Sequence, residues 1–462
     1  MEMTMRKRSR QKDKRHESAG WLFSNRDLLK LFWPLIIEQI LVMIVGVADT
    51  MMVSQAGEAA VSGVGLVDMV ANLIITVFGA LATGGAVIVS QYLGNRDTAS
   101  SRRAAGQVSL LTLLVSLVIT VICVFGCQGI LNLFFGSVAL DVMQACYTYF
   151  FISAFSFPFL AIYSSAGALF RSAKMTKITM YVSLLMNGIN IVGNFIGVFI
   201  LHLGVAGVAI PTLLSRIVAG LLLFALLFRS KYQIGLQWKD MLGWDGSMMK
   251  RILGIALPNG IENGLFSLGR VLVTSIVALF GTAQIAANSV AGSIDQIALV
   301  IIQAINLGIV TVVGQCVGAD DYRQARYYIR KLMKAAYIVN GIGGGLVILA
   351  LPVLLNLYSL SPEARAWTML LVIMHNVLCT LLHPTSFVLP NGMRAAGDAK
   401  YSMIVGIASM LVFRLGTAVV FGIWLHMGIL GVWIAMGADW ACRSLFFWLR
   451  FKSGRWEEFR AI

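Results

Sequence analysis

Charged residues are scarce in this sequence. Asp, Glu, Lys and Arg make up 12% of the 462 residues, about half of the ~25% that is usual for soluble domains. Hydrophobic residues make up 58%. Apolar runs of about 20 residues, the length that crosses a hydrocarbon core as a helix, recur from residue 28 to residue 450. They lack the alternation that is typical of a membrane β-barrel. The sequence therefore predicts an all-α integral membrane protein in a lipid bilayer.

Motifs for catalysis are also missing. The sequence holds no glycine-rich nucleotide loop, no HExxH pattern and no recognisable catalytic triad. The six cysteines fall mostly within apolar runs, where packing as small hydrophobic side chains is favoured over a disulfide or a metal site. We therefore expect no enzymatic activity, no cofactor and no metal ligands.

Positive charge is concentrated on one side of the expected membrane. Of the 36 Lys and Arg residues, 31 fall in tails and loops on one side and Arg365 falls on the other. The remaining four lie within helices: Arg216, Arg270, Arg414 and Arg443. This distribution follows the positive-inside rule, so both termini are expected in the cytoplasm of a cell-membrane protein. Topology thus accounts for the net charge of +15, and no nucleic-acid partner is expected.

An internal repeat with a shift of 224 residues organises the chain. A constant shift over most of both halves indicates a duplicated unit. The matched segments are Pro34-x3-Glu38 with Pro258-x3-Glu262, SQYLGNRDTASSRR (90–103) with GQCVGADDYRQARY (314–327), LGVAGVAI (203–210) with MGILGVWI (427–434) and, at a shift of 223, RSAKMTKITM (171–180) with RAAGDAKYSM (394–403).

The repeat predicts two lobes of six helices each. Because six is even, the lobes share one orientation, and we expect a pseudo-two-fold axis along the membrane normal. Two such lobes enclose a cleft and give alternating access by rocking, which favours a transporter over a channel or a membrane enzyme. The fourth helix is expected to run unbroken near residues 141–170. The expected parts are a basic tail (1–27), a first lobe (28–228), a linker (229–251), a second lobe (252–450) and a C-terminal tail (451–462).

Polar side chains within the first lobe form one candidate ion-coupling site. An ionisable group inside a bilayer costs roughly 2.5–3.5 kcal/mol even on lenient scales, so it indicates function. Carboxylate, amide and hydroxyl oxygens are the ligands that a cation or proton site uses. The alternative is that the amides and hydroxyls only join helix to helix. The candidates are Asp49 on the first helix, Asp68 on the second, Asn190 and Asn194 on the fifth and Thr212 on the sixth.

The second lobe carries a different set, which we expect to line the cleft. Glu262 and Asp295 are expected to bracket Arg270, and Asn288 lies about two turns before Asp295 on the same helix. Such a cluster is either a substrate or gating network or a buried ionic group that only maintains packing. Glu38 matches Glu262 in the repeat, which predicts a shared role, either lining the cleft or joining the lobes across it.

Two further groups are less specific. Asp439 and Arg443 are four residues apart on the last helix, so an intrahelical ion pair is expected. His375 and His383 are too isolated for a metal site, although a role in proton coupling stays open.

Together these segments resemble the multidrug and toxic compound extrusion (MATE) transporters. The resemblance runs from about residue 28 to residue 450 and rests on PLIIEQILVMIVGVADTMMVSQAG, ATGGAVIVSQYLGNRD, LFRSAKMTK and NIVGNFIGVFILHLGVAGVAIPT, with their second-half counterparts. It implies a twelve-helix antiporter that exports cationic, amphipathic drugs or metabolites in exchange for Na⁺ or H⁺. It also implies that Asp49 couples the ion, with Asn190, Asn194 and Thr212 at matching positions. The family has an Asp where this chain has Asn194, and the tenth-helix acid of another family branch is absent.

The expected charge inventory favours a cationic cargo. We count about six acids within the membrane, Glu38, Asp49, Asp68, Glu262, Asp295 and Asp439, against four arginines. The alternative is a flippase for a lipid-linked precursor, as in related superfamily members, whose cleft should be strongly basic to hold a pyrophosphate group. We expect a monomer. The physiological substrate and the choice between Na⁺ and H⁺ stay open at this point.

Overall fold

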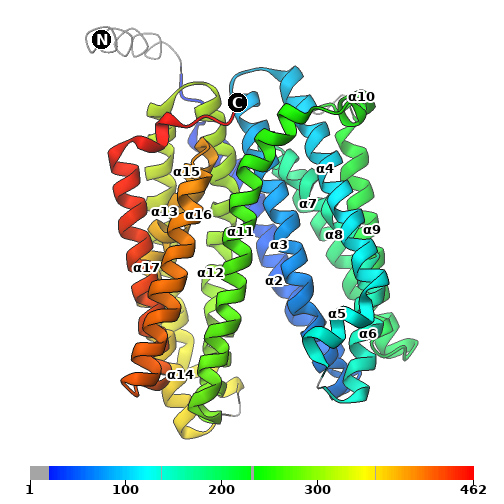
Figure 1. Cartoon of the computed structure of the whole chain (residues 1–462), viewed down its shortest axis with the longest axis vertical. Helices are drawn as coiled ribbons and strands as arrows, with labels where there is room; N and C mark the ends of the chain where they lie inside the picture. Colours follow the sequence, from blue (N-terminus) through cyan, green and yellow to red (C-terminus); the bar gives the residue numbers. More distant parts are fainter. Residues whose placement is uncertain (1–19, 137, 230–233, 359) are drawn as a thin grey trace.

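The computed structural model describes residues 20–136, 138–229, 234–358 and 360–462. Most of the expected basic tail (1–19) and part of the expected linker (230–233) lie outside the described residues. In the described ranges the chain contains no strand. Eleven helices there are long and apolar enough to cross a membrane, and one bent pair supplies a twelfth when counted as one span. The prediction of an all-α membrane protein with twelve spans in two lobes is confirmed (Figure 1).

The first lobe extends from α2 to α9. A short α5 (Cys127–Phe135) precedes α6, and η1 (Ile196–Ile200) continues α8. The spanning helices are α2 (Asn25–Ser54), α3 (Glu58–Gly94), α4 (Thr98–Phe125), α6 (Leu140–Ala154) with α7 (Phe157–Ser172), α8 (Thr176–Phe195) and α9 (Ala206–Leu227).

The second lobe repeats this order from α11 to α17. The linker forms a short α10 (Trp238–Leu242), and η7 (Arg455–Glu458) follows the last span. The spans are α11 (Gly246–Val277) with η2 (Ala278–Phe280), α12 (Thr282–Gly318), α13 (Tyr322–Leu354) with η3 (Leu355–Leu357), α14 (Pro362–His383) with η4 (Pro384–Val388) and α15 (Leu389–Ala396), α16 (Ala399–Ser409) with η5 (Met410–Gly416) and η6 (Val419–Trp424), and α17 (Gly428–Ser453).

The sequence repeat is visible in local structure. Asp97 and Asp321, which match in the repeat, each cap the helix that follows by accepting a backbone hydrogen bond of 2.9 Å, from Ser100 N and Gln324 N. A carboxylate in this position satisfies a backbone N–H that the first helical turn leaves without a partner. The two matching helices α3 and α12 both contain 37 residues.

The expectation of an unbroken fourth span is wrong. That span consists of α6 and α7, which meet at an angle of 52°. Pro158 lies in the first turn of α7 and has no N–H to donate to the carbonyl four residues earlier, which favours a bend at this point. At the break, the Ser156 hydroxyl donates to Ser153 O at 2.6 Å.

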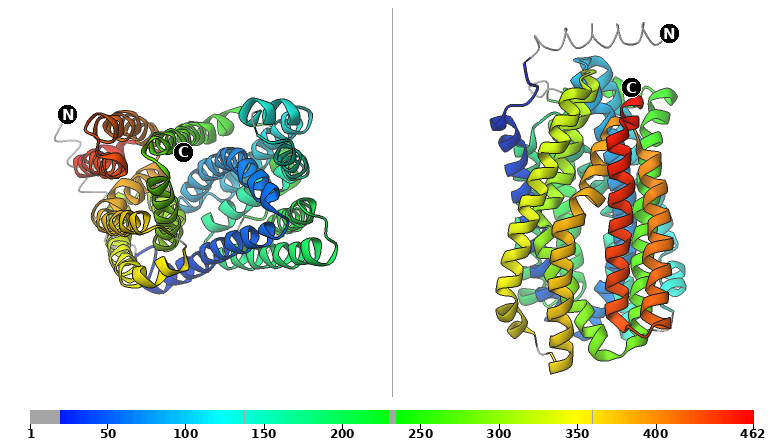
Figure 2. Two further views of the ribbon diagram at one scale, coloured as in Figure 1. Left: turned by 90° about the horizontal axis from the view of Figure 1, so that it is seen from below. Right: turned by 90° about the vertical axis from the view of Figure 1, so that its left-hand side faces the viewer.

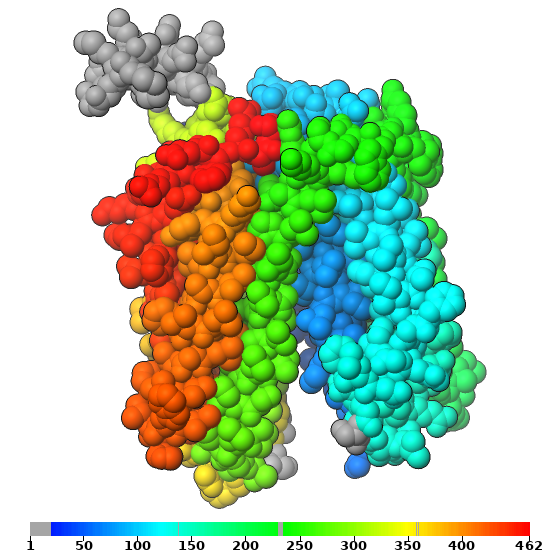
Figure 3. All heavy atoms as spheres, in the orientation of Figure 1, coloured from blue at the N-terminus to red at the C-terminus, as the bar shows by residue number. Residues whose placement is uncertain are grey.

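The two lobes share one core at one end of the bundle and have separate cores at the other. The shared core contains Val87 and Ile88 of α3 together with Val312 and Val313 of α12, all fully buried. Of the other two cores, one lies in the first lobe and the other in the second. The end where α3 and α12 finish is called here the joined end, and the opposite end the open end. The lobes diverge towards the open end, at the bottom of Figures 1 and 3.

The lobes meet through reciprocal packing of their first two spans. α11 packs against α3, α2 packs against α12, and α3 packs against α12. Each lobe therefore places its first span on the second span of the other lobe, as a pseudo-two-fold axis requires. Seen from the open end, the first-lobe helices lie on one side and the second-lobe helices on the other (Figure 2).

At the joined end, the backbones of α3 and α12 are in direct contact. A Cβ added at Gly94 would lie 2.0 Å from Gln315 O, and one added at Gly318 would lie 1.9 Å from Gln91 O. Only glycine allows this approach. The same two glutamines reach across to the other lobe, because Gln91 Nε2 donates to Ala395 O at 2.8 Å and Gln315 Nε2 donates to Ser172 O at 2.7 Å.

Segments outside the spans reinforce the joined end. Phe23, which precedes the first lobe, exchanges hydrogen bonds of 3.2 and 2.6 Å with the Tyr328 hydroxyl of the second lobe. Ala461, which follows the second lobe, donates its N–H to Gln91 Oε1 of the first lobe at 3.1 Å. Each segment thus connects its own lobe to the other.

Candidate functional site

A cleft of about 1170 Å³ lies between the lobes. Side chains from both lobes line it, with the second lobe supplying the larger share. In the space-filling view the lobes are separated by a slot beside α11 at the open end (Figure 3). Five residues that the sequence placed in the second-lobe or cleft group line it: Glu38, Glu262, Arg270, Asn288 and Asp295. Asn288 is held there by Trp433, whose Nε1 donates to Asn288 Oδ1 at 3.0 Å.

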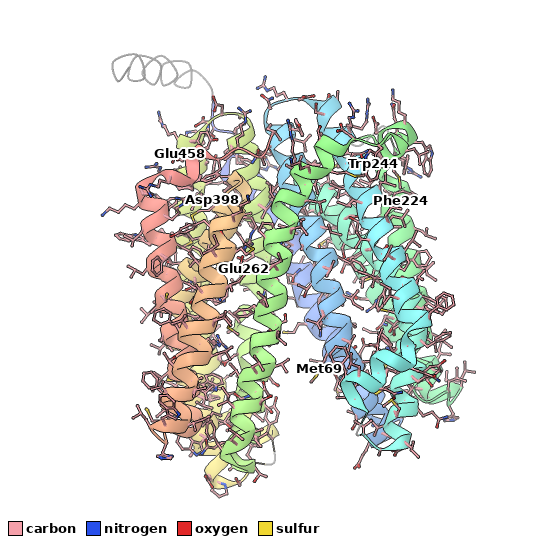
Figure 4. All side chains as sticks on the ribbon, in the orientation of Figure 1. Met69, Phe224, Trp244, Glu262, Asp398 and Glu458 are labelled. Carbon is pink, nitrogen blue, oxygen red and sulfur yellow. The ribbon has the colours of Figure 1, made fainter. Side chains whose placement is uncertain are left out.

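Two matching Glu–Arg pairs face the cleft, one in each lobe. In the first lobe, Glu38 lies 3.6 Å from Arg171 and accepts a 2.9 Å hydrogen bond from the Thr179 hydroxyl. In the second, Glu262 lies 2.7 Å from Arg394, and Figure 4 shows Glu262 on α11 between the two ends of the bundle. Both glutamates line the cleft and pair within their own lobe, so in this structure their pairs do not join the lobes. The repeat already matched Arg171 to Arg394, and that signal was available in the sequence.

The expected Glu262–Arg270–Asp295 cluster does not form. Glu262 pairs with Arg394, which α15 brings from a distant part of the chain, and Asp295 Oδ1 lies 3.0 Å from His375 Nδ1. Arg270 has no acidic partner within 4.0 Å among the described residues. Glu262 and Arg270 are two turns apart on α11. In the folded protein, Arg394 lies next to Glu262 and His375 lies next to Asp295, so neither acid pairs with Arg270.

A second ionic group lies in the second lobe, where Arg414 and Arg443 line the cleft and Asp439 does not. Asp439 is fully buried, and its Oδ1 is 2.9 Å from Arg443 Nε, the pair expected on the last helix. Its Oδ2 is 3.6 Å from Arg414 Nη1 of η5. The Ser409 hydroxyl also donates to Asp439 Oδ1. One carboxylate therefore serves two guanidinium groups.

The charge balance of the cleft is the reverse of the expected one. Its lining contains three acids and five arginines. The expectation was wrong because Asp49 and Asp68 lie outside the residues that line the cleft, Asp439 is buried behind the wall, and Arg171 and Arg394 point inwards from helix ends. The number of charged residues within the spans therefore does not predict the charge of the residues that line the cleft.

Four of the predicted first-lobe residues form one hydrogen-bonded chain. Asn194 Nδ2 donates to Asp49 Oδ1 at 2.7 Å and lies 3.3 Å from Asn190 Oδ1. Asn190 Nδ2 donates to Thr212 Oγ1 at 3.0 Å, and Thr212 donates to Val208 O at 2.9 Å. The chain joins α2, α8 and α9. Asn194 Oδ1 is buried and accepts no hydrogen bond from any described residue.

Asp68 lies near this chain without a hydrogen bond to it. Tyr149 of α6 and Arg216 of α9 lie near the Asp68 carboxylate, and Arg216 attracts both Asp49 and Asp68. Arg216 is anchored by a 2.8 Å hydrogen bond from Nη1 to Ser156 Oγ at the break between α6 and α7. Sequence reasoning assigned no role to Arg216, although it follows Thr212 by four residues and therefore shares its helix face.

The first-lobe group has the ligand types of a cation or proton site. A carboxylate, two amides and a hydroxyl meet within hydrogen-bonding distance, and the buried Asn194 Oδ1 is an acceptor without a donor. A hard cation or a proton on Asp49 would satisfy such an oxygen. The structure thus contains two separate candidate binding sites: the first-lobe group, which suits a cation or a proton, and the cleft between the lobes.

Comparisons with known proteins agree with the repeat. A family model described as MatE matches residues 34–196 and 258–420, once in each lobe and at the same shift of 224 residues. The uncharacterized transporter YisQ of Bacillus subtilis is 31% identical over 441 residues, covering 93% of this chain and 94% of YisQ. The probable multidrug resistance protein NorM of Thermotoga maritima is 26% identical, with coverage of 95% and 94%.

A solved structure shows the same fold. It is the outward-facing conformation of a multidrug resistance MATE family transporter, and it aligns with a TM-score of 0.86 at 20% identity, covering 92% of this chain and 96% of that one.

Proposed function

Since the chain belongs to the MatE family, the multidrug and toxic compound extrusion (MATE) transporters, we propose that it is a secondary active antiporter. It exports amphipathic small molecules, cationic ones among them, in exchange for Na⁺ or H⁺. Relatives of the chain are named as multidrug resistance proteins, and one from Staphylococcus haemolyticus as a multidrug export protein. We further propose a monomer in the cell membrane that needs no cofactor and catalyses no reaction.

The observation that carries this proposal is a cleft that opens at one end only. The shared core and the crossing of α3 with α12 close the joined end, while separate cores leave the open end apart. Alternating access needs two such states of one cleft. We assign the joined end to the cytoplasm, because the basic loops gather there under the positive-inside rule. The structure then corresponds to an outward-facing state.

We assign ion coupling to Asp49, with Asn194, Asn190 and Thr212. The orphaned Asn194 Oδ1 supports this assignment. A flip of the Asn194 amide would turn this oxygen, in place of Nδ2, towards Asp49. That arrangement suits either a bound cation or a protonated Asp49, which would donate to the oxygen. Asp68 and Arg216 set the electrostatic field around the group.

For a cationic group on the cargo, we propose Asp295 as the counter-charge. Asp295 pairs with a histidine and with no arginine among the described residues, and its Oδ2 is buried without a hydrogen bond. The rings of Trp433 and Trp440 line the same cleft. Aromatic faces attract cations within about 6 Å of the ring centroid.

The test is ethidium efflux from proteoliposomes under separate Na⁺ and pH gradients. The wild type should follow one of the two gradients, and Asp49→Asn should abolish that dependence, because the amide cannot exchange a charge. Asp141→Asn is the matched control, since Asp141 only accepts from its neighbour Val142 N at 2.9 Å. Efflux driven by neither gradient, or equal dependence in the wild type and Asp49→Asn, would overturn the proposal.

A second candidate function is a flippase for a lipid-linked anionic precursor. The five arginines that line the cleft favour it, because a lipid-linked pyrophosphate needs a basic cleft. The measurement is transbilayer movement of a fluorescent phosphatidylglycerol in the same proteoliposomes, read by dithionite quenching. Accelerated movement without ethidium efflux would favour the flippase, and efflux without accelerated movement would reject it.

A further inference from the structure

Three arginines of the second lobe are called here the arginine wall: Arg270 of α11, Arg414 of η5 and Arg443 of α17. All three line the cleft. Arg414 and Arg443 share the single carboxylate of Asp439. Arg270 is exposed and lines the same cleft as Arg414. Among the described residues, Asp439 is the one acid within 4.0 Å of these three guanidinium groups, so the wall carries excess positive charge.

Hydrogen-bond donors along this part of the cleft also lack acceptors. Trp440 is 4% exposed, and its Nε1 donates to no described residue. The same holds for the buried Nε atoms of Arg414 and Arg394. Buried donors without partners are rare in folded proteins, and each one needs an explanation. An oxyanion suits such a surplus of donors, because its oxygens carry several lone pairs and only accept hydrogen bonds.

Aromatic rings flank the wall and offer an apolar surface next to it. The guanidinium carbon of Arg443 lies 5.1 Å from the centroid of Phe266 and 5.5 Å from that of Phe387. The guanidinium carbon of Arg414 lies 5.8 Å from the Phe266 centroid. The rings hold the guanidinium groups in place. They also leave an apolar contact for the part of a ligand that carries the charged group.

In an alternating-access cycle, the excess positive charge makes closure of the cleft costly. In the open cleft, water solvates Arg270. When the cleft closes around its contents, that water leaves, and a guanidinium without a counter-charge is costly to bury. A negatively charged group on the cargo would remove this penalty. The planar guanidinium fork matches the geometry of carboxylate and phosphate oxygens.

We propose that the arginine wall is an oxyanion-binding subsite, which takes the carboxylate, sulfonate or phosphate group of an amphipathic cargo. The inference rests on the proposed function, because it specifies one charged group of the transported molecule. Arg270 is the specificity-determining residue, since it is the member of the wall that has no acidic partner among the described residues. Asp295, which lines the same cleft from α12, stays available for a cationic group on the same cargo.

The test uses two probes with one fluorophore and opposite charges. Dansylglycine carries a carboxylate, and dansylcadaverine carries an amine. Binding to the purified full chain in neutral-lipid nanodiscs is read from energy transfer between the cleft tryptophans and the dansyl group. The wild type should bind dansylglycine, and Arg270→Gln should weaken that binding about tenfold or more, as expected when a charged hydrogen bond is lost. Binding of dansylcadaverine should not weaken in the variant.

Two variants serve as controls. Arg365→Gln makes the same change at a residue outside the cleft lining, where Arg365 Nη2 donates to Asn356 Oδ1 at 2.9 Å. It should leave the binding of both probes unchanged. Arg270→Lys keeps the charge without the planar fork and should bind dansylglycine better than Arg270→Gln does. Equal dansylglycine affinities for the wild type and Arg270→Gln would overturn the subsite.

Binding without any gradient separates this inference from the proposed function. If Asp49→Asn proteoliposomes transport like the wild type but Arg270→Gln loses dansylglycine, the coupling proposal fails and the subsite stands. A lipid source is tested by adding phosphatidylglycerol to the nanodiscs. Loss of dansylglycine binding in the wild type under that condition assigns the subsite to a lipid headgroup. Unchanged binding assigns it to a soluble oxyanion.

Discussion

Adding one methyl group at the joined end should shift the protein away from the open-cleft state. Gly318→Ala places a Cβ at 1.9 Å from Gln91 O, whereas an ordinary contact needs at least 3.4 Å. The two helices must therefore separate by about 1.5 Å at this point. Gly94→Ala makes the matching clash, at 2.0 Å from Gln315 O.

The free-energy cost of this clash changes the equilibrium between the open-cleft state and the alternative state. Overpacking of a tight contact costs about 1–3 kcal/mol, and a change of this size alters a two-state ratio by about 5- to 150-fold. The clash exists only while α3 and α12 cross closely. The penalty should therefore fall on the state in which the joined end is closed, and not equally on both states.

The assay is thiol labelling of Ser289→Cys, which lines the cleft on α12 and is exposed. The background is Cys442→Ser, because Cys442 is the native cysteine that is not fully buried. In whole cells, a membrane-impermeant maleimide should label Gly318→Ala more slowly than the parent. Gly254→Ala is the matched control, since a Cβ there meets nothing within 4 Å. Equal labelling rates for Gly318→Ala and Gly254→Ala would refute the reasoning.

Three further predictions concern stability, measured by unfolding of the purified protein in detergent. Glu262→Gln and Arg394→Gln should each cost about 3–5 kcal/mol, because each leaves a buried charge without its partner. The double variant should cost clearly less than the two together, and strict additivity would contradict the pairing. Thr179→Val should cost about 1.5–3 kcal/mol by removing the hydrogen bond to Glu38, whereas Thr179→Ser should restore most of it. Asp245→Ala should cost about 1 kcal/mol by removing the cap of α11, where Asp245 Oδ1 accepts from Met248 N at 3.0 Å, and an unchanged midpoint would show that the cap contributes nothing.

The cleft shows how far reasoning from the sequence alone can be trusted. Ionisable residues inside apolar helices could be singled out from the sequence, because burial of a charge is costly wherever it occurs along the chain. Their partners were not predictable in the same way. Glu262 was expected to neutralise Arg270 on the same helix. In the structure Glu262 pairs instead with Arg394, which is 132 residues away in the sequence and 2.7 Å away in space.

The break in the fourth span had a signal that was overlooked. Pro158 removes one backbone donor, and the resulting bend places Ser156 beside Arg216. The π-helical segment η4 carries the same mark, since it begins at Pro384. The other π-helical segments, such as η5, which carries Arg414, contain no proline. We have no local explanation for where they begin.

Hydropathy, charge placement and the 224-residue repeat determined the fold class, the number of spans and the two-lobe plan, because these depend on local composition and its periodicity. Spacing along one helix placed Asn190 and Asn194 on the same face, and the resemblance to the MATE family implied that Asp49 and Thr212 join them in one group. Tertiary structure alone decided what faces the cleft and with which charge. Ion pairs form between side chains that packing brings within about 4 Å, and sequence distance does not limit that approach. The excess of arginines in the cleft is therefore a property of how the lobes pack.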